Sequence, residues 1–124
     1  MNSSSDDLNW PNAVSIVCTD RFRSMAFYRK VLGAELLQGD DPITCPWLQL
    51  GGLTITLLEN TDRSSQLSFS EQAMATLLVF TDDISGAFDR ATRWGARVIE
   101  PLVEGNANFL IADPDGIYIE VAGE

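Results

Sequence analysis

Short stretches of alternating apolar and polar residues recur along the chain and predict β-strands. The first contains Val14, Ile16 and Cys18, and every second side chain in it can therefore face a core. Two later stretches are separated only by Gly51-Gly52, which is a signal for a two-residue hairpin. The complete pattern predicts strands over residues 14–18, 34–38, 47–50, 53–59, 75–81, 96–102, 108–112 and 117–121.

Two other stretches, residues 21–32 and 84–94, carry apolar side chains at helical spacing. In the second of these, the side chains recur at positions i, i+3, i+4 and i+7, which form one face of an amphipathic helix. A comparable stripe runs along the first, so both stretches are predicted to be helices that bury this face. The stripes consist of Phe22, Met25, Ala26 and Leu32 in the first helix and of Ile84, Ala87, Phe88, Ala91 and Trp94 in the second.

The order strand, helix cap, helix and glycine occurs twice, and the two copies align without a gap at an offset of half the chain length. Thr-Asp pairs ending in Asp20 and Asp82 are suited to cap the two helices at their N-termini. Gly33 and Gly95 follow where left-handed caps would end them. These identities indicate an internal duplication and an α+β fold. We expect a tail over residues 1–11 and one domain over 12–122, with β-α-β-β-β modules over 12–59 and 73–122 joined by a linker over 60–72.

Alternation also sorts the strand residues onto two faces of each predicted sheet. A uniformly apolar face should pack beneath the helices, while a mixed face is left for function. The apolar face comprises Val14, Ile16, Cys18, Leu53, Ile55, Leu57, Ala75, Leu77, Val79, Ile117, Ile119 and Val121. The mixed face comprises Ser15, Val17, Thr54, Thr56, Leu58, Thr76, Leu78, Phe80, Tyr118 and Glu120.

Composition narrows the function classes. The 124 residues include 8 basic and 18 acidic ones, a net charge of −10 that argues against nucleic-acid binding and favours either a cationic ligand or simple solubility. No stretch resembles a signal peptide or a membrane span, so we expect a cytoplasmic protein without a membrane partner. Cys18 lies in a predicted strand and Cys45 in a turn, and buried thiols are favoured over a disulfide.

Two motifs resemble those of the vicinal oxygen chelate superfamily, which includes glyoxalase I, bleomycin resistance proteins and extradiol dioxygenases. One is the helix end Phe-Tyr-x-x-Val-Leu-Gly, from Phe27 to Gly33, and the other is Asp-Pro-Asp-Gly-x-x-x-Glu, from Asp113 to Glu120. With the duplicated module, the resemblance covers nearly the whole chain. It implies curled mixed sheets around a cavity with helices on the outer face, commonly completed by dimerisation.

The resemblance also implies four places for the ligands of a divalent metal. Carried over by motif spacing, they fall on Ala13, Thr56, Thr76 and Glu120. Only Glu120 is a good ligand, and the chain contains no histidine, so a shift in alignment cannot supply imidazole. We therefore expect no metal and no other cofactor, and metal-dependent glyoxalase or dioxygenase activity is disfavoured.

The resemblance still implies a cavity, even without the metal ligands. Our leading hypothesis is a non-catalytic homodimer that binds an aromatic or cationic small molecule, as bleomycin resistance proteins bind theirs. Trp47 has ordinary packing as its alternative role, and Trp94 is expected in the helix core, while the role of Trp10 stays open. The predicted ligand-binding residues are Trp47, Gln49, Thr54, Thr56, Thr76, Phe80, Tyr118 and Glu120.

Two alternatives remain open at this point. One is a metal-independent isomerase or lyase in which Glu120 acts as the general base and hydroxyl groups donate hydrogen bonds. The other is a subunit or accessory domain that keeps the fold and has no ligand. A cavity filled by the protein's own side chains would favour the latter.

Overall fold

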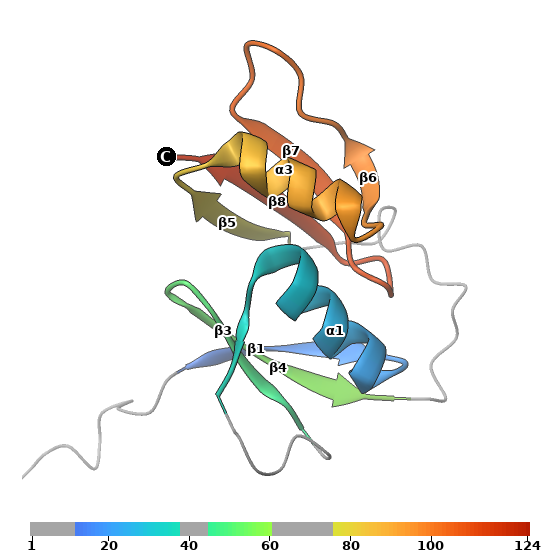
Figure 1. Ribbon diagram of the computed structural model, residues 1–124. Helices are drawn as coiled ribbons and strands as arrows, with labels where there is room; N and C mark the ends of the chain where they lie inside the picture. Colours follow the sequence, from blue (N-terminus) through green and yellow to red (C-terminus); the bar gives the residue numbers. More distant parts are fainter. Residues whose placement is uncertain (1–11, 38–44, 61–75) are drawn as a thin grey trace, which may run out of the picture.

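The computed structural model describes residues 12–37, 45–60 and 76–124. Within these ranges the chain forms β-α-β-β-β twice, and Figure 1 shows the two copies as modules placed one above the other. The predicted tail with Trp10, the position Ala75 and nearly all of the predicted linker lie outside the described residues. The elements are β1 (Ala13–Cys18), α1 (Arg21–Leu32), β2 (Glu35–Leu36), β3 (Trp47–Leu50), β4 (Leu53–Glu59), β5 (Leu77–Thr81), α3 (Ile84–Arg93), β6 (Arg97–Glu100), β7 (Asn108–Ala112) and β8 (Tyr118–Gly123).

Each module contributes one four-stranded mixed sheet. The strand order is β1-β4-β3-β2 in the first sheet and β5-β8-β7-β6 in the second. In both, the first strand of the module runs parallel to its last strand, and the other pairs are antiparallel. This matching topology confirms the predicted α+β fold of two duplicated modules.

The strands lie where alternation predicts them, with some ends shifted. β2 covers two residues of the predicted 34–38, and β6 covers four residues of the predicted 96–102. β8 instead continues to Gly123, beyond the predicted end. The ends differ because a strand extends only as far as its neighbour pairs with it, and β2 pairs with β3 at two positions.

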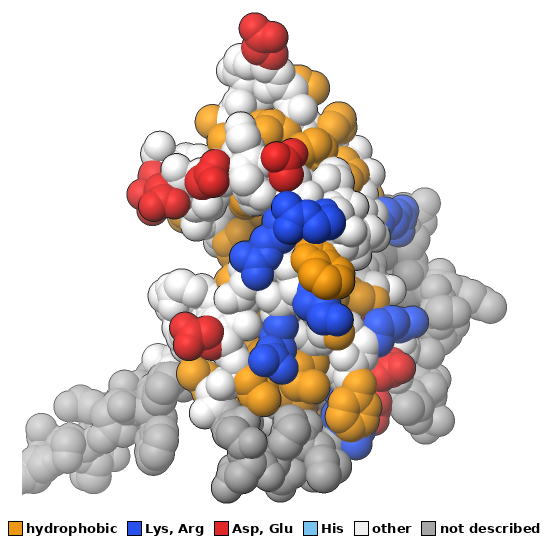
Figure 2. Space-filling model, viewed as in Figure 1, with side chains coloured by type: hydrophobic (Ala, Val, Ile, Leu, Met, Phe, Trp, Pro, Cys, Tyr) orange, Lys and Arg blue, Asp and Glu red, His pale blue; other side chains and the backbone are white. Residues whose placement is uncertain are grey.

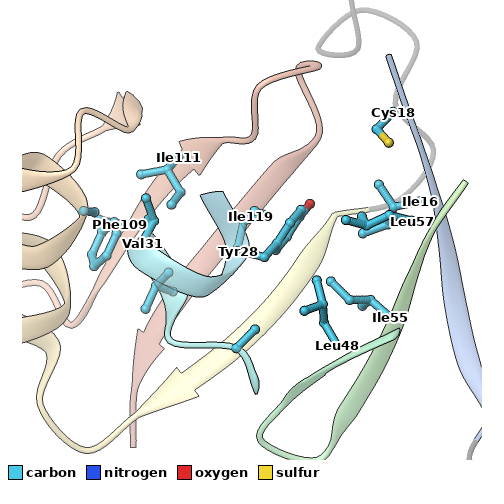
Figure 3. Packing of buried hydrophobic residues seen from close by; sticks show 13 residues of the cluster. Ile16, Cys18, Tyr28, Val31, Leu48, Ile55, Leu57, Phe109, Ile111 and Ile119 are labelled. Carbon is cyan, nitrogen blue, oxygen red and sulfur yellow. The ribbon is translucent and has the colours of Figure 1, made fainter. Parts of the chain in front are cut away.

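The apolar faces of both sheets meet the helices in one continuous core. Figure 3 shows side chains from both modules gathered around Tyr28 and Val31 of α1. Of the predicted core face, Val14 is the exception: it lies near the start of the edge strand β1 and is 43% exposed. The buried hydrophobic residues are Ile16, Cys18, Tyr28, Val31, Ala34, Leu48, Ile55, Leu57, Ala91, Phe109, Ile111, Ala112, Ile119 and Val121.

The predicted buried stripe of α1 is confirmed only in part, since Met25 and Leu32 are half-buried and pack against the core. The helix buries Ser24, Tyr28 and Val31, while Phe22 is 52% exposed. Ser24 and Tyr28 reach the core because acidic side chains of the second module accept hydrogen bonds from their hydroxyl groups. Trp94, expected in the helix core, is also exposed, because it follows the last turn of α3 and lies beside Lys30 on the surface.

The predicted caps of α1 are confirmed, and those of α3 are each displaced by one residue. Asp20 accepts hydrogen bonds from two backbone N–H groups of α1, and Gly33 ends the helix with φ 77°. At the end of α3 the cap is Trp94, with φ −92°, and the predicted cap Gly95 follows it with φ 77°. At the start of α3, however, the cap is Asp83 rather than Asp82, because the helix begins one residue later than in the first module and Asp83 accepts from the N–H of Gly86.

No helix in the described part of the chain is long and apolar enough to cross a membrane.

Candidate functional site

The helix-free face of the first sheet carries four of the predicted site residues. Trp47 pairs with Thr56 across β3 and β4, and Gln49 pairs with Thr54, so all four side chains lie on one face. The Thr54 hydroxyl donates to Gln49 Oε1 at 2.6 Å, and Gln49 Nε2 donates to the Gly51 carbonyl at 2.6 Å. Thr54 and Thr56 are both buried. The strands therefore bring this half of the predicted site together.

The second sheet carries the other half on its own helix-free face. Tyr118 and Glu120 alternate along β8, and Glu120 pairs with Leu78 of β5. The Asn108 side-chain amide donates to Glu120 Oε2 at 2.9 Å. Phe80 follows on β5 and is 62% exposed.

The eight predicted residues thus form two groups on two sheets rather than one enclosed cavity within the chain. Thr76, which directly precedes β5, is exposed and belongs to the second group. β1 and β5 are edge strands, and neither has a second strand partner among the described residues. Leu58 and Leu78, also on these faces, are about half exposed at 51% and 49%.

A hollow that does not coincide with the predicted site lies between the modules. It has a volume of about 780 Å³ and is enclosed by the end of α1, the β3–β4 hairpin, β5 and the start of α3. In Figure 2 it opens as an indentation at the left. Of the eight predicted residues only Phe80 lines this hollow, so the hollow is not the predicted site.

The residues at the four metal-ligand places do not fit a metal ion. Ala13 pairs with Thr54 and so lies on the same face as Thr56, but its methyl group offers no donor atom. Thr76, just before β5, and Glu120, on β8, belong to the other module. One carboxylate and two hydroxyl groups lack the charge and ligand strength for zinc, nickel or iron. No cluster of three metal-ligating side chains occurs among the described residues.

A buried polar network joins the modules at the Asp-Pro-Asp-Gly turn, which sequence reasoning treated only as a turn and a family motif. The Tyr28 hydroxyl donates to Asp113 Oδ2 at 2.8 Å, and the N–H groups of Asp115 and Ile117 donate to Oδ1. Asp115 in turn accepts from the Thr19 hydroxyl at 2.7 Å. The turn therefore anchors the second module to the start of the first helix.

Burial controls the titration of this network. It raises the pKa of Asp113, against the opposing effect of the three hydrogen bonds that its carboxylate accepts. The pKa of Tyr28 is raised well above its usual value, first by burial and then by the nearby Asp113 charge. Burial also raises the pKa of the Cys18 thiol, and both Cys18 and Cys45 are free thiols. The network lies on the helix side of the sheets, away from the predicted ligand-binding residues.

Duplicated β-α-β-β-β modules, with a mixed polar and aromatic face on each sheet and an Asp-Pro-Asp-Gly turn joining them, define the class to which this protein belongs. The family model of the Glyoxalase/Bleomycin resistance protein/Dioxygenase superfamily matches residues 10–121. The chain is a member of this superfamily, as the motifs predicted. None of the curated proteins compared with it matches significantly.

Solved structures share the fold over nearly the whole chain. TioX from Micromonospora sp. ML1 is 22% identical, with a TM-score of 0.68 over 90% of this chain and 98% of TioX. The fosfomycin resistance protein FosX from Listeria monocytogenes is 15% identical, with a TM-score of 0.71 over 95% of each chain. A protein of unknown function from Agrobacterium tumefaciens str. C58 is 24% identical, with a TM-score of 0.66 over 95% of this chain and 99% of that one. These similarities establish the fold.

Proposed function

We propose that this chain is a non-catalytic homodimer that binds a small molecule between the helix-free faces of two subunits. The observation that carries the proposal is the composition of these faces. They combine aromatic rings with hydrogen-bonding groups, and they leave large apolar side chains such as Phe80 and Leu78 exposed. Exposed apolar side chains that share a face favour a binding surface.

Pairing of two chains brings the two groups of site residues together. The first sheet ends at β1 and the second at β5, and within the described parts of the chain the outer edge of each strand is open to another strand. In a two-fold dimer, β1 of one subunit next to β5 of the other places the Trp47 face opposite the Tyr118 face twice. Each dimer would then hold two identical sites, and each site would need both chains.

The side chains on these faces indicate the chemistry of the ligand. Trp47, Phe80 and Tyr118 offer flat rings for stacking or for a cation. Glu120 is the one carboxylate among the predicted residues, and the net charge of −10 also attracts cations. We therefore favour a planar aromatic or cationic compound. A cytoplasmic location accords with two free thiols.

A structural neighbour supports small-molecule binding by this fold. A mutant of the Listeria FosX has been crystallised with Mn(II) and 1S,2S-dihydroxypropylphosphonic acid. In this chain a metal-free mode of binding is favoured, because Ala13 and Thr76 offer no strong ligand at two of the four places. The metal-independent enzyme is the competing function, and it depends on Glu120 alone as a base.

The first experiment is native mass spectrometry of the purified protein before and after incubation with zinc, nickel, manganese and iron. We expect a metal-free dimer, and a retained small mass would identify the ligand class. Phe80→Glu should give monomers, because a charge would enter the subunit contact, while Val103→Glu, at an exposed residue off these faces, should not. A wild-type monomer at micromolar concentration, or metal at full occupancy, would contradict the proposal.

Ligand binding is then measured by tryptophan fluorescence with a panel of planar aromatic cations and their neutral analogues. Trp47→Ala and Tyr118→Ala should each weaken binding about three- to tenfold, the value of one aromatic contact. Trp94→Ala is the matched control, since Trp94 lies on the helix side. If Trp47→Ala binds every ligand as tightly as Trp94→Ala, the site is elsewhere. Substrate turnover that is abolished by Glu120→Gln would favour the enzyme instead.

A further inference from the structure

Positive charge is concentrated on one surface of this acidic protein. Five of its eight lysine and arginine residues line two adjoining hollows on the helix side, away from the helix-free faces. Figure 2 shows the blue side chains gathered over α1 and α3, with the red carboxylates around them. We call this surface the basic strip, and its cations are Arg23, Arg29, Lys30, Arg90 and Arg97.

The two hollows have apolar walls between their cations. One, of about 380 Å³, lies between α1 and the residues before β6, and Phe27 and Trp94 line it. The other, of about 520 Å³, runs along α1, and Phe22 and Met25 line it. Lys30 lines both, so its side chain stands between them. The strip therefore offers two apolar depressions on either side of a central cation.

Within the part of the chain that the structure describes, three of the five cations of the strip lack an ion pair, while Arg23 pairs with Asp115 at 3.4 Å and Arg90 donates to the Lys30 carbonyl. Among the described residues, no ion pair involves Arg29, Lys30 or Arg97. The Lys30 ammonium instead lies 5.0 Å from the centre of the Trp94 ring. Of the acidic side chains that the structure describes, only Asp113 lines either hollow, and it is 3% exposed and accepts a hydrogen bond from a buried tyrosine. An anion arriving from solvent thus meets unpaired positive charge.

We propose that the basic strip binds a short acidic segment of a partner protein, with apolar side chains in the two hollows and carboxylates on Lys30, Arg29 and Arg97. Charge complementarity selects an acidic ligand, and the apolar walls favour a peptide over a simple anion. The range of the electrostatic attraction favours a short acidic segment over a long one. At physiological ionic strength charges are screened beyond about 8 Å, so a short segment senses the strip alone.

A longer polyanion would meet the rest of the surface as well. Nucleic acid or an anionic membrane extends past the strip to the surrounding carboxylates of a chain with net charge −10. The strip also lies on the opposite side of the sheets from the faces in the proposed function. Segment binding and ligand binding can therefore occur together, and either can fail without the other.

The test uses the full chain and a short fluorescein-labelled peptide in which glutamates and leucines alternate, with fluorescence anisotropy as the readout. We expect saturable binding that weakens as salt is raised. Lys30→Gln and Arg97→Gln should each weaken it up to about fivefold, the range for an exposed ion pair. Arg93→Gln is the matched control, because Arg93 is an exposed cation of α3 that lines neither hollow.

Competing probes decide what the strip recognises. Replacing the peptide's glutamates by glutamines should abolish binding. Replacing its leucines by serines should weaken binding. Trp47→Ala should leave it unchanged. The proposal is overturned if the peptide does not bind, if Arg93→Gln weakens binding as much as Lys30→Gln, or if citrate binds as well as the peptide. It is equally overturned if single-stranded DNA or phosphatidylserine vesicles bind more tightly than the peptide.

Discussion

The Tyr28 hydroxyl donates a 2.8 Å hydrogen bond to Asp113, and this contact joins the helix of the first module to the turn before the last strand of the second. Both side chains are buried, at 0% and 3% exposure. Replacing only one partner of such a buried hydrogen bond lowers the free energy of unfolding strongly, because the other polar group then stays buried without a partner. The bond therefore couples the stability of the two modules.

We expect Tyr28→Phe to lower the free energy of unfolding by about 1–3 kcal/mol, since Asp113 would lose the hydroxyl group that it contacts. Urea unfolding followed by circular dichroism measures this loss. Tyr118→Phe is the control, because Tyr118 lies on the partly exposed helix-free face. Equal stability of the two variants would mean that the bond contributes nothing.

The stability of the protein should depend on the protonation of Asp113. Burial raises its pKa above the ordinary value near 3.9. At a pH between the ordinary pKa and the raised pKa of the folded state, Asp113 keeps its proton in the folded chain and has released it in the unfolded chain. This contribution to stability is therefore complete below pH ~3.9 and is lost as the pH rises through the folded pKa.

Asp113→Asn removes that titration and isolates it from the other carboxylates. The free energy of unfolding of the wild type, minus that of Asp113→Asn, should be larger near pH ~4 than at pH ~7. Urea titrations of both proteins across this range give the difference. A difference that stays constant, or that grows with rising pH, contradicts the raised pKa.

Gly33→Ala should destabilise the protein by about 1–2 kcal/mol, because Gly33 has φ 77° and a side chain there is strained. The added Cβ would also lie 3.1 Å from Arg90 Nη1. Gly52→Ala is the matched control, since φ at Gly52 is not positive and a Cβ there meets no atom within 4 Å. Thermal unfolding of the two variants compares them, and similar melting temperatures would rule out strain at Gly33.

Asp83→Ala should cost about 0.5–2 kcal/mol, because its side chain caps α3 by accepting from the Gly86 N–H. Asp82→Ala should change stability by less than about 0.5 kcal/mol, as exposed residues without such contacts do. Both variants lose one negative charge, so net charge does not separate them. A larger loss of stability in Asp82→Ala than in Asp83→Ala would mean that Asp82, the position favoured by the repeat alignment, is the cap.

Local features were predictable because neighbouring residues determine them. Gly33 ends α1 because glycine tolerates positive φ, and Asp20 caps the same helix because its carboxylate reaches nearby N–H groups. Both effects involve residues a few positions apart. The N-terminal cap of α3 was missed by one residue. Three residues in succession, Thr81, Asp82 and Asp83, can each serve as such a cap.

Buried polar residues were not predictable in the same way. Hydrophobic spacing placed Phe22 in the core and ignored Ser24, whereas the structure does the reverse. Ser24 and Tyr28 are buried because Asp115 and Asp113 lie near them in space, more than eighty positions away in sequence. No local pattern contains that proximity.

The sequence by itself determined the duplicated modules, the caps of α1, the hairpin and the absence of histidine ligands, since each follows from residue type or short-range spacing. It also placed Trp47 and Thr56, and Tyr118 and Glu120, on shared faces, because a strand alternates with period two. Only the tertiary structure decided that these two faces do not enclose a common cavity within one chain. Packing between α1 and α3 sets how the modules lie, and such packing depends on contacts between residues far apart along the chain.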